Sequence, residues 1–479
     1  MKPGIYSTYL LLIRKAVIFF LLIIPVFCYA QPLGSDSSLV IHSLVFKGNK
    51  ITHENIMRRE MEFKQGDTVT TLELQSKISQ SKLNLLNTSL FNFVTIETDT
   101  ACVTRAIDVR ITVIERWYTW IGVIAELADR NLNTWWETRD FTRVNIGLRL
   151  SRNNFRGRME QLRFAFQVGP SQKFSMYYEM PYINRRKTMG LVFNAGFSRQ
   201  HEVGYITKND KFIYLNSANF LRQDLALSAS IRIRRNMIHS HQFGLQYNKY
   251  NFTDSLLILN PSYSFGNNKQ FGYFSFVYQF KADHRDIHYY PLKGWYFDII
   301  ANETGFGMLP GHAGSIWNLN PTFRYYQPLS VRFNVSGSVA AKVSSKAAQP
   351  YFYQRGLGYG RDFVRGYEYY VIDGKQYILI KTNIKFALLQ PRTMQIGFIP
   401  SEKFSKLHYS VYLNIFADAG YVSGIEQNEN YHNLLPDSML GGIGAGIDVV
   451  TYYDKVMRLE YTINRWGESG IFIHFIAGI

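Results

Sequence analysis

One segment of the sequence combines an arginine with glycines and aromatic residues in a way that allows it to hold a buried carboxylate. Within residues 356–374 stands the run Val364, Arg365, Gly366 and Tyr367. An arginine can grip a carboxylate through two parallel hydrogen bonds, and this attraction is strongest away from water. Residues 344–374 form a connection longer than most loops without a function, and the apolar Phe363 should not remain exposed. We therefore expect this loop to be tucked inside the protein, with a surface-exposed loop as the alternative.

The other patterns that could carry chemistry are weak. The sequence has no G-x-S-x-G, H-E-x-x-H or G-x-x-x-x-G-K-[ST] motif. The glycine repeat that starts at Gly356 has no strand–helix unit around it, so it does not indicate a nucleotide site. The pair His239 and His241 lies near an expected turn, which favours a solvated loop over a metal site. We expect no catalytic residues, no enzymatic activity, no cofactor and no bound metal.

The N-terminus is typical of a secretory signal. Lys2, Arg14 and Lys15 precede the apolar run 16–27, and Ala30 offers a small residue for cleavage. An uncleaved anchor helix is the alternative, but the run is shorter than the roughly 20 residues that a helical span requires. We predict a signal peptide over residues 1–30 and an exported protein. With only two cysteines in the chain, a disulfide framework and a four-cysteine zinc site are excluded.

Residues 31–117 are expected to form a small α/β domain. An apolar strand over residues 40–46 is followed by a short helix that Thr52 can cap and that runs to Glu60. Thr70 and Glu73 have the spacing of a capping box and open a second helix. Two more alternating strands follow up to Trp117, so the pattern predicts three strands covered by two helices.

From residue 118 to the C-terminus the chain alternates in the manner of long β-strands. Apolar side chains occupy every second position in residues 143–152, 225–234, 409–421 and 441–450. A soluble β-sandwich would alternate too. However, segments of about ten residues exceed the usual strand length and match the 9–11 residues that cross a bilayer at a tilt. Many segments also end in paired aromatics, as interfacial girdles do. The pattern therefore predicts a transmembrane β-barrel over residues 118–479.

The number of strands follows from the quality of the alternation. About 18 segments are candidates, but residues 211–217 and 255–264 alternate poorly and are expected to lie in loops. Removing them leaves about 16 antiparallel strands, an even number as is usual for bacterial barrels. The expected fold is an all-β transmembrane barrel preceded by a small α/β domain.

The composition agrees with a barrel and locates the excess of positive charge. Aromatic residues make up 16% of the chain and the mean hydropathy is −0.14, which excludes a helical membrane protein with many spans. Of 53 Lys and Arg, three lie in residues 1–30 and ten in 31–117, while ten of the 36 Asp and Glu lie in 31–117. The expected barrel therefore carries the whole excess, 40 against 26. Several basic residues point inward by strand parity: Arg149, Arg163, Arg232, Arg234, Lys381 and Lys385.

The run at residues 364–367 resembles the (V/I)-R-G-(F/Y) signature of the BamA/TamA family of outer-membrane assembly factors. Residues 178–182, 283–294 and 416–420 resemble further motifs of this family, and residues 31–117 resemble a POTRA domain. The resemblance implies a sixteen-stranded barrel, with the signature on an inward-folded sixth extracellular loop and five strands after it. It also implies that Arg365 is held by acids on the lumen wall.

The resemblance assigns the partner of this arginine and also reveals departures. Asp418 stands at the position of one family acid and points inward by parity, so we expect an ion pair between Arg365 and Asp418. The second acid normally lies on the strand after the loop, where this chain has Lys385, so the arginine should be held more weakly or by other partners. Two further departures are a C-terminal Ile479 in place of an aromatic residue and a single POTRA-like domain. The glycines at positions 442, 444 and 446 would leave room for the loop.

The resemblance implies a function in handling other polypeptides. We expect the barrel to insert or translocate unfolded outer-membrane or secreted client polypeptides through a lateral seam between residues 118–126 and 471–479. The bacterial outer membrane, with the small domain in the periplasm, is the expected location, and accessory lipoproteins are candidate partners. Nucleic acid is not expected as a partner, because the basic residues line a lumen. The alternatives are an anion-favouring secretion pore or diffusion channel, and a lipid-handling or adhesive barrel.

Overall fold

The computed structural model describes residues 38–101, 106–127, 139, 144–309, 315–345, 349–424, 431–451 and 453–475. The predicted signal peptide, both cysteines and Ile479 lie outside the described residues. Among these residues, no helix is long and apolar enough to cross a membrane.

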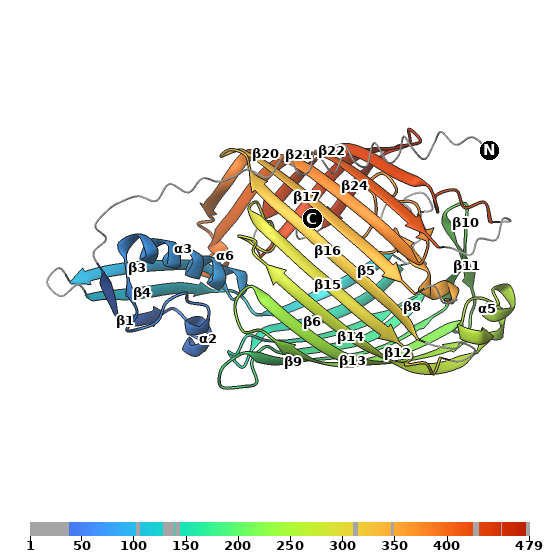
Figure 1. The fold of residues 1–479 in the computed structure, drawn as a ribbon, viewed down its shortest axis with the longest axis horizontal. Coiled ribbons are helices and arrows are strands. Elements are labelled where there is room, and N and C mark those ends of the chain that lie inside the picture. The colour runs from blue at the N-terminus through green and yellow to red at the C-terminus, as the bar shows by residue number, and fades with distance from the viewer. Residues whose placement is uncertain are drawn as a thin grey trace.

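The N-terminal part folds as a small α/β domain, shown in blue in Figure 1. Its elements in chain order are β1 (Leu39–Lys47), α2 (Glu54–Arg59), β2 (Thr68–Val69), α3 (Thr71–Asn87), β3 (Phe91–Ala101) and β4 (Ala106–Glu115). The sheet has the order β2-β1-β4-β3, in which β1 and β4 are parallel. Two helices cover it as predicted, but the sheet has four strands rather than three. The additional strand β2 has only two residues, too few for a periodicity to reveal it.

The two predicted helix caps differ in outcome. Thr70 caps α3, since its Oγ1 accepts the backbone N–H of Glu73 at 3.2 Å. The prediction for Thr52 was wrong, because α2 begins after His53. The Oγ1 of Thr52 instead donates to the buried carboxylate of Glu115 at 2.7 Å, and Glu115 also accepts the Thr52 N–H at 2.7 Å. A side chain that satisfies a buried acid is not available to cap a helix.

The body of the protein is one sheet of sixteen antiparallel strands that curls into a barrel (Figure 1). Its first eight strands are β5 (Thr119–Leu127), β6 (Val144–Phe155), β7 (Glu160–Val168), β8 (Ser171–Met180), β9 (Met189–Gln200), β12 (Arg222–Ile233), β13 (His239–Phe252) and β14 (Gln270–Asp283). The other eight are β15 (Gly294–Thr304), β16 (Ile316–Pro328), β17 (Phe333–Ser344), β20 (Gln376–Gln395), β21 (Lys406–Ser423), β22 (Met439–Thr451), β23 (Lys455–Asn464) and β24 (Ser469–Phe475). The predicted number of strands is therefore confirmed.

The pleat of the strands separates an apolar outer surface from a polar interior. On β6, Ile146 and Leu148 are each 58% exposed on the outside, while the neighbouring Asn145 on the opposite face is 2% exposed. Such an exposed apolar surface is stable only against an apolar solvent, which is the expected environment of a transmembrane barrel.

The two poorly alternating segments lie outside the barrel sheet. Residues 211–217 contribute to a separate hairpin of β10 (Glu202–Lys208) and β11 (Lys211–Asn216), and residues 255–264 include the helix α5 (Asp254–Leu259). Both lie at the end of the barrel away from the α/β domain (Figure 1). A cluster of aromatic side chains packs beneath α5, and the guanidinium of Arg222 lies 5.4–5.7 Å from three of their rings: Tyr250, Phe252 and Phe352.

The α/β domain is fixed to the mouth of the barrel by buried polar contacts. The amide of Asn154, on β6, donates to Thr52 Oγ1 at 2.8 Å. On the other side of the boundary between β5 and β24, Arg116 holds Asp454 in the turn between β22 and β23 through two hydrogen bonds of 2.6 and 3.0 Å. The domain therefore contacts both the early and the late strands of the barrel.

We predict that Glu115→Ala destabilises the α/β domain at the buried site where it meets the barrel. It removes the acceptor of the two Thr52 donors, and buried donors without an acceptor cost about 2–3 kcal/mol. Denaturation of the full-length protein in detergent, followed by pulse proteolysis, measures this loss for the domain. Glu97→Ala is the matched control, because Glu97 is exposed on β3. Equal proteolysis of both variants would contradict the prediction.

Candidate functional site

The connection between β17 and β20 folds back into the barrel lumen. It contains the short strands β18 (Arg355–Leu357) and β19 (Ile372–Asp373), which pair with each other. Val364, Arg365 and Tyr367 are 1%, 3% and 2% exposed. Val364 and Tyr367 pack with apolar side chains of the wall and loop, namely Leu357, Ile372, Leu379, Val422, Leu435 and Leu440. The apolar residues of the loop thus account for its inward position.

Gly366 and a glycine of the barrel wall allow the loop to approach the strands. Gly366 has a φ of +95°, a conformation that favours glycine. A Cβ at Gly442 would lie 1.8 Å from the Arg365 carbonyl oxygen, so no other residue fits there. The glycines at 444 and 446 face strand and side-chain atoms of the wall instead of the loop. Of the three glycines that we expected to leave room for the loop, Gly442 is therefore the one that the loop contacts.

The guanidinium of Arg365 is held by acids on two different strands. Its Nε and Nη2 donate to the two carboxylate oxygens of Asp418, on β21, at 2.7 and 2.6 Å. Its Nη1 donates to Glu460 on β23 at 3.1 Å and to Asn383 on β20 at 2.8 Å. The guanidinium makes two further contacts. Its Nη2 donates to the Thr382 carbonyl at 3.2 Å, and its Cζ lies 3.7 Å from the centre of the Phe416 ring. The structure thus brings Arg365 and Asp418 together and adds a second acid.

We call these groups the arginine cage: Arg365, Asp418, Glu460, Asn383 and Phe416. Glu460 was missed from the sequence, although its strand was expected. Parity within β23 places Glu460 inward, together with Arg458, and this signal could have found it. Parity does not give the relative height of β21 and β23, so it does not show that both acids meet one arginine.

Lys385, where the family resemblance implied a second acid, belongs to a neighbouring network. Lys385 is 1% exposed, and its Nζ lies 4.3 Å from the centre of the Tyr290 ring. The hydroxyl of Tyr290 donates to Asp448 at 2.8 Å, and Arg458 donates to both carboxylate oxygens of Asp448 at 2.7 and 2.8 Å. The Arg458 Nε also lies 3.7 Å from Glu460, so the two networks touch.

Tyr290 reaches the lumen from the turn between β14 and β15, and this turn also contacts the α/β domain. The amide of Asn87, the last residue of α3, donates to the Asp286 carbonyl at 2.9 Å and accepts the His288 N–H at 3.1 Å. Burial lowers the pKa of His288 to about 4, so its ring is neutral at neutral pH. A continuous set of contacts therefore links the domain to the arginine cage.

The last strand of the sheet also faces the cage. His474, on β24, has its Nε2 3.7 Å from Glu460 and 3.9 Å from Glu368 of the loop. Glu368 in turn accepts the backbone N–H of Gly366 at 2.8 Å. The loop is thereby connected to four strands at the C-terminal end of the sheet, namely β20, β21, β23 and β24.

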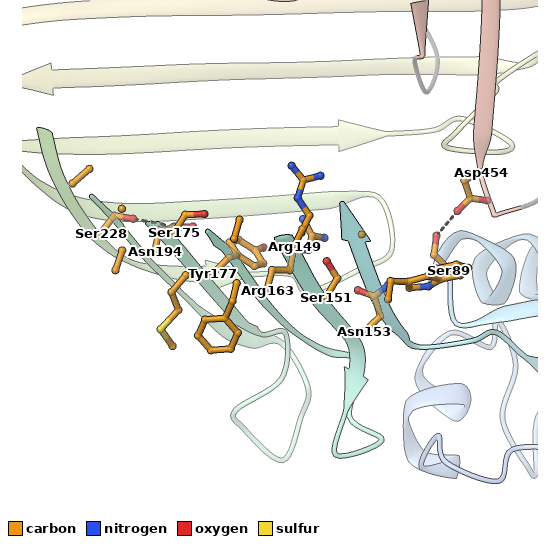
Figure 2. Close-up of a pocket in the computed structure, with 18 of the residues that line it drawn as sticks. Ser89, Arg149, Ser151, Asn153, Arg163, Ser175, Tyr177, Asn194, Ser228 and Asp454 are labelled. Carbon is orange, nitrogen blue, oxygen red and sulfur yellow. Dashed lines mark hydrogen bonds between the residues drawn. The ribbon is translucent and has the colours of Figure 1, made fainter. Parts of the chain in front are cut away.

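The basic residues predicted to face the lumen fall into two groups: four contact an acid or an aromatic ring of the surrounding structure, and two line an open cavity. Arg232 contacts Glu179, and Arg234 lies 3.6 Å from Glu60 of the α/β domain. Lys381 lies over the ring of Phe363 at 4.3 Å, and Lys385 belongs to the network above. Arg149 and Arg163 line an open cavity of about 940 Å³ (Figure 2). In the part of the chain that is described, no three metal-ligating side chains lie close together.

The fold defines a transmembrane β-barrel with an α/β domain at one mouth and a loop anchored in its lumen. Residues 154–463 match the model of the Omp85 superfamily domain, and residues 39–116 match a POTRA model described as a surface antigen variable number repeat. Since the first match covers more than half of the 479 residues, the chain belongs to the Omp85 superfamily. The predicted resemblance to the BamA/TamA family is therefore confirmed as membership of this superfamily.

Two solved structures are similar to this chain at low sequence identity. CdiB from Escherichia coli is 13% identical, with 91% of this chain and 75% of that chain covered and a TM-score of 0.54. BamA from Haemophilus ducreyi lacking POTRA domains 1–3 is 15% identical, with 91% and 83% covered and a TM-score of 0.49. A search of curated protein sequences finds no match.

Family membership settles the location of the protein. It is a β-barrel of the bacterial outer membrane with its POTRA domain in the periplasm, as predicted. The end that carries α5 and the hairpin of β10 and β11 therefore faces the outside of the cell.

We predict that Arg365 and Asp418 are energetically coupled. Arg365→Ala leaves two buried carboxylates without their guanidinium, and breaking a buried ion pair costs about 3–5 kcal/mol. The double variant with Asp418→Ala should lose at least 1 kcal/mol less than the sum of the single losses, by about the scale of coupling between contacting residues. Urea unfolding in liposomes measures all three. Arg332→Ala, in an exposed turn, is the control, and strictly additive losses would refute the coupling.

We predict that Gly442→Ala displaces the loop from the lumen. The added methyl would overlap the Arg365 carbonyl, and overpacking of this kind costs about 1–3 kcal/mol. Protease cleavage within residues 349–375 of the native protein reports displacement. Gly441→Ala is the matched control, since an added Cβ there meets nothing within 4 Å. If both variants resist cleavage equally, the wall does not require a glycine at 442.

Proposed function

We propose that this barrel inserts client polypeptides into the outer membrane, or translocates them across it, through a seam between β5 and β24. The observation that carries the proposal is the position of the arginine cage beside one end of the sheet. The sheet runs in order from β24 to β5, and within residues 119–127 and 469–475 no ladder register joins these two strands. The loop thus braces the strands that border one side of the seam.

The lengths and surfaces of the two end strands support this proposal. The described part of β24 has seven residues and pairs with β23 from Met457 to Ile463. On the membrane face of β5, Ile121 and Val123 are 75% and 77% exposed. Backbone N–H and C=O groups that remain unpaired on an edge strand raise its free energy in lipid. A client strand can pair with these groups by hydrogen bonding.

The POTRA domain supports capture of clients in the periplasm. Its sheet ends on one side in β3, an edge strand of eleven residues. An extended client segment, or a segment of an accessory lipoprotein, can add to such an edge by β-augmentation. The proposed role is binding and assembly, with no chemical step.

A cross-link across the seam tests the proposal. Pairs of cysteines along residues 119–127 and 469–475, in a Cys102→Ser background, should on oxidation stop the assembly of newly made outer-membrane proteins, and reduction should restore it. Leu227→Cys with Tyr247→Cys is the matched control, because these residues are paired within the wall on β12 and β13. Full activity of the cross-linked seam would exclude lateral opening.

A diffusion channel is the second candidate, and the open cavity beside Arg149 and Arg163 favours it. Against it stand the loop that fills the lumen beside β20–β24 and the domain over the mouth. Single-channel recording separates the two functions. A steady anion-selective current that is indifferent to Arg365→Ala, together with unchanged outer-membrane protein levels after depletion, would support the channel.

A further inference from the structure

The half of the lumen opposite the arginine cage holds an open chamber. Its cavity of about 940 Å³ is lined by strands β5–β9, β12 and β13, by Ser89 of the POTRA domain and by the turn at residues 453–455. Among the described residues that line it, none comes from the inward loop. Figure 2 shows Arg149 extending from the wall into the open interior. The chamber is therefore separate from the arginine cage.

The charges around the chamber are not balanced. Asp454 is the one acid among the described lining residues, and it is held by Arg116 through two hydrogen bonds and by Ser89 at 3.1 Å. Arg149, Arg163 and Lys455 also line the chamber and make no ion pair with a described residue. Arg163 rests over the Tyr177 ring at 5.1 Å. Three cations thus face this space with no compensating acid among the residues that the structure describes, which favours an anionic occupant.

The chamber wall provides room and hydrogen-bonding groups for an extended chain. Gly122 on β5 has nothing within 4 Å of an added Cβ, and Gly196 on β9 meets only a backbone oxygen at 4.0 Å. These glycines border open space and do not relieve a tight contact. Hydroxyl and amide side chains stand on five strands of this wall, β6, β8, β9, β12 and β13: Ser151, Ser175, Asn194, Ser228 and Gln246.

We infer that this chamber binds an extended polypeptide segment through its Asp and Glu carboxylates, with Arg149 and Arg163 as the contacting cations. The inference rests on the proposed function and adds to it that the bound segment of the client is negatively charged. A polypeptide is favoured because the chamber lies between the POTRA domain and β5, where a client entering from the periplasm would reach the seam. Arginine is suited to this role because its fork matches a carboxylate.

Binding of two labelled peptides to the full-length protein in detergent tests the inference. The probes are unstructured 20-residue Gly/Ser peptides, one with six Glu and one with six Gln at the same positions. Fluorescence anisotropy should show at least about tenfold tighter binding of the Glu peptide, and this preference should decline with salt. In Arg149→Gln/Arg163→Gln the preference should disappear. Arg185→Gln/Arg186→Gln, in the exposed turn between β8 and β9, removes the same charge and should preserve it.

Three outcomes would overturn the inference: equal binding of both peptides, an unchanged preference in Arg149→Gln/Arg163→Gln, or the same loss in the control variant. Displacement of the Glu peptide by micelles doped with phosphatidylglycerol, in a manner that needs Arg149 and Arg163, would assign the chamber to lipid and also overturn it. Failure of the proposed function is separately visible, because the seam cross-link would then leave assembly of outer-membrane proteins intact whatever the peptides do.

Discussion

The interior of this barrel is organised by the cost of burying a guanidinium. An arginine that is 3% exposed must recover its lost hydration from fixed partners, and Arg365 does so with two carboxylates, an amide, a carbonyl and an aromatic face. Because these partners come from β20, β21 and β23, the charge is satisfied only when three strands are in register and the loop is seated. The arginine cage thus links the position of the inward loop to the register of β20, β21 and β23.

The acid at position 460 supplies the second carboxylate that the family resemblance implied at the position of Lys385. Lys385 does not approach Arg365 in place of the acid. It lies against Tyr290 and beside the Asp448–Arg458 pair, so its charge is directed to another part of the lumen. The second acid of this chain therefore comes from β23, and Arg365 is held by two carboxylates.

Much of the architecture follows from local patterns in the sequence, and most of what does not follow depends on register between strands. Alternation of side chains identified sixteen strands and the inward position of Asp418, while the length and apolar residues of the loop indicated that Arg365 lies inside the barrel. It could not show that Glu460 reaches the same arginine, since that depends on the relative height of strands far apart in the sequence. Strand parity likewise predicted only that Arg149 and Arg232 both point inward. Only the three-dimensional structure shows that Arg232 contacts Glu179 while Arg149 faces open space. The two-residue strand β2 is too short for any periodicity.

The attachment of the POTRA domain gives the barrel a mechanical asymmetry. Asn154 and Asp454 hold the domain from the two sides of the β5–β24 boundary, and both contacts lie at the periplasmic rim. The domain bridges this rim, so under the proposed lateral opening the end strands would meet their greatest resistance to separation there and their least at the opposite rim. A gap opened under this restraint would be wedge-shaped and wider toward the cell exterior, and its width would depend on how firmly the POTRA domain holds both contacts.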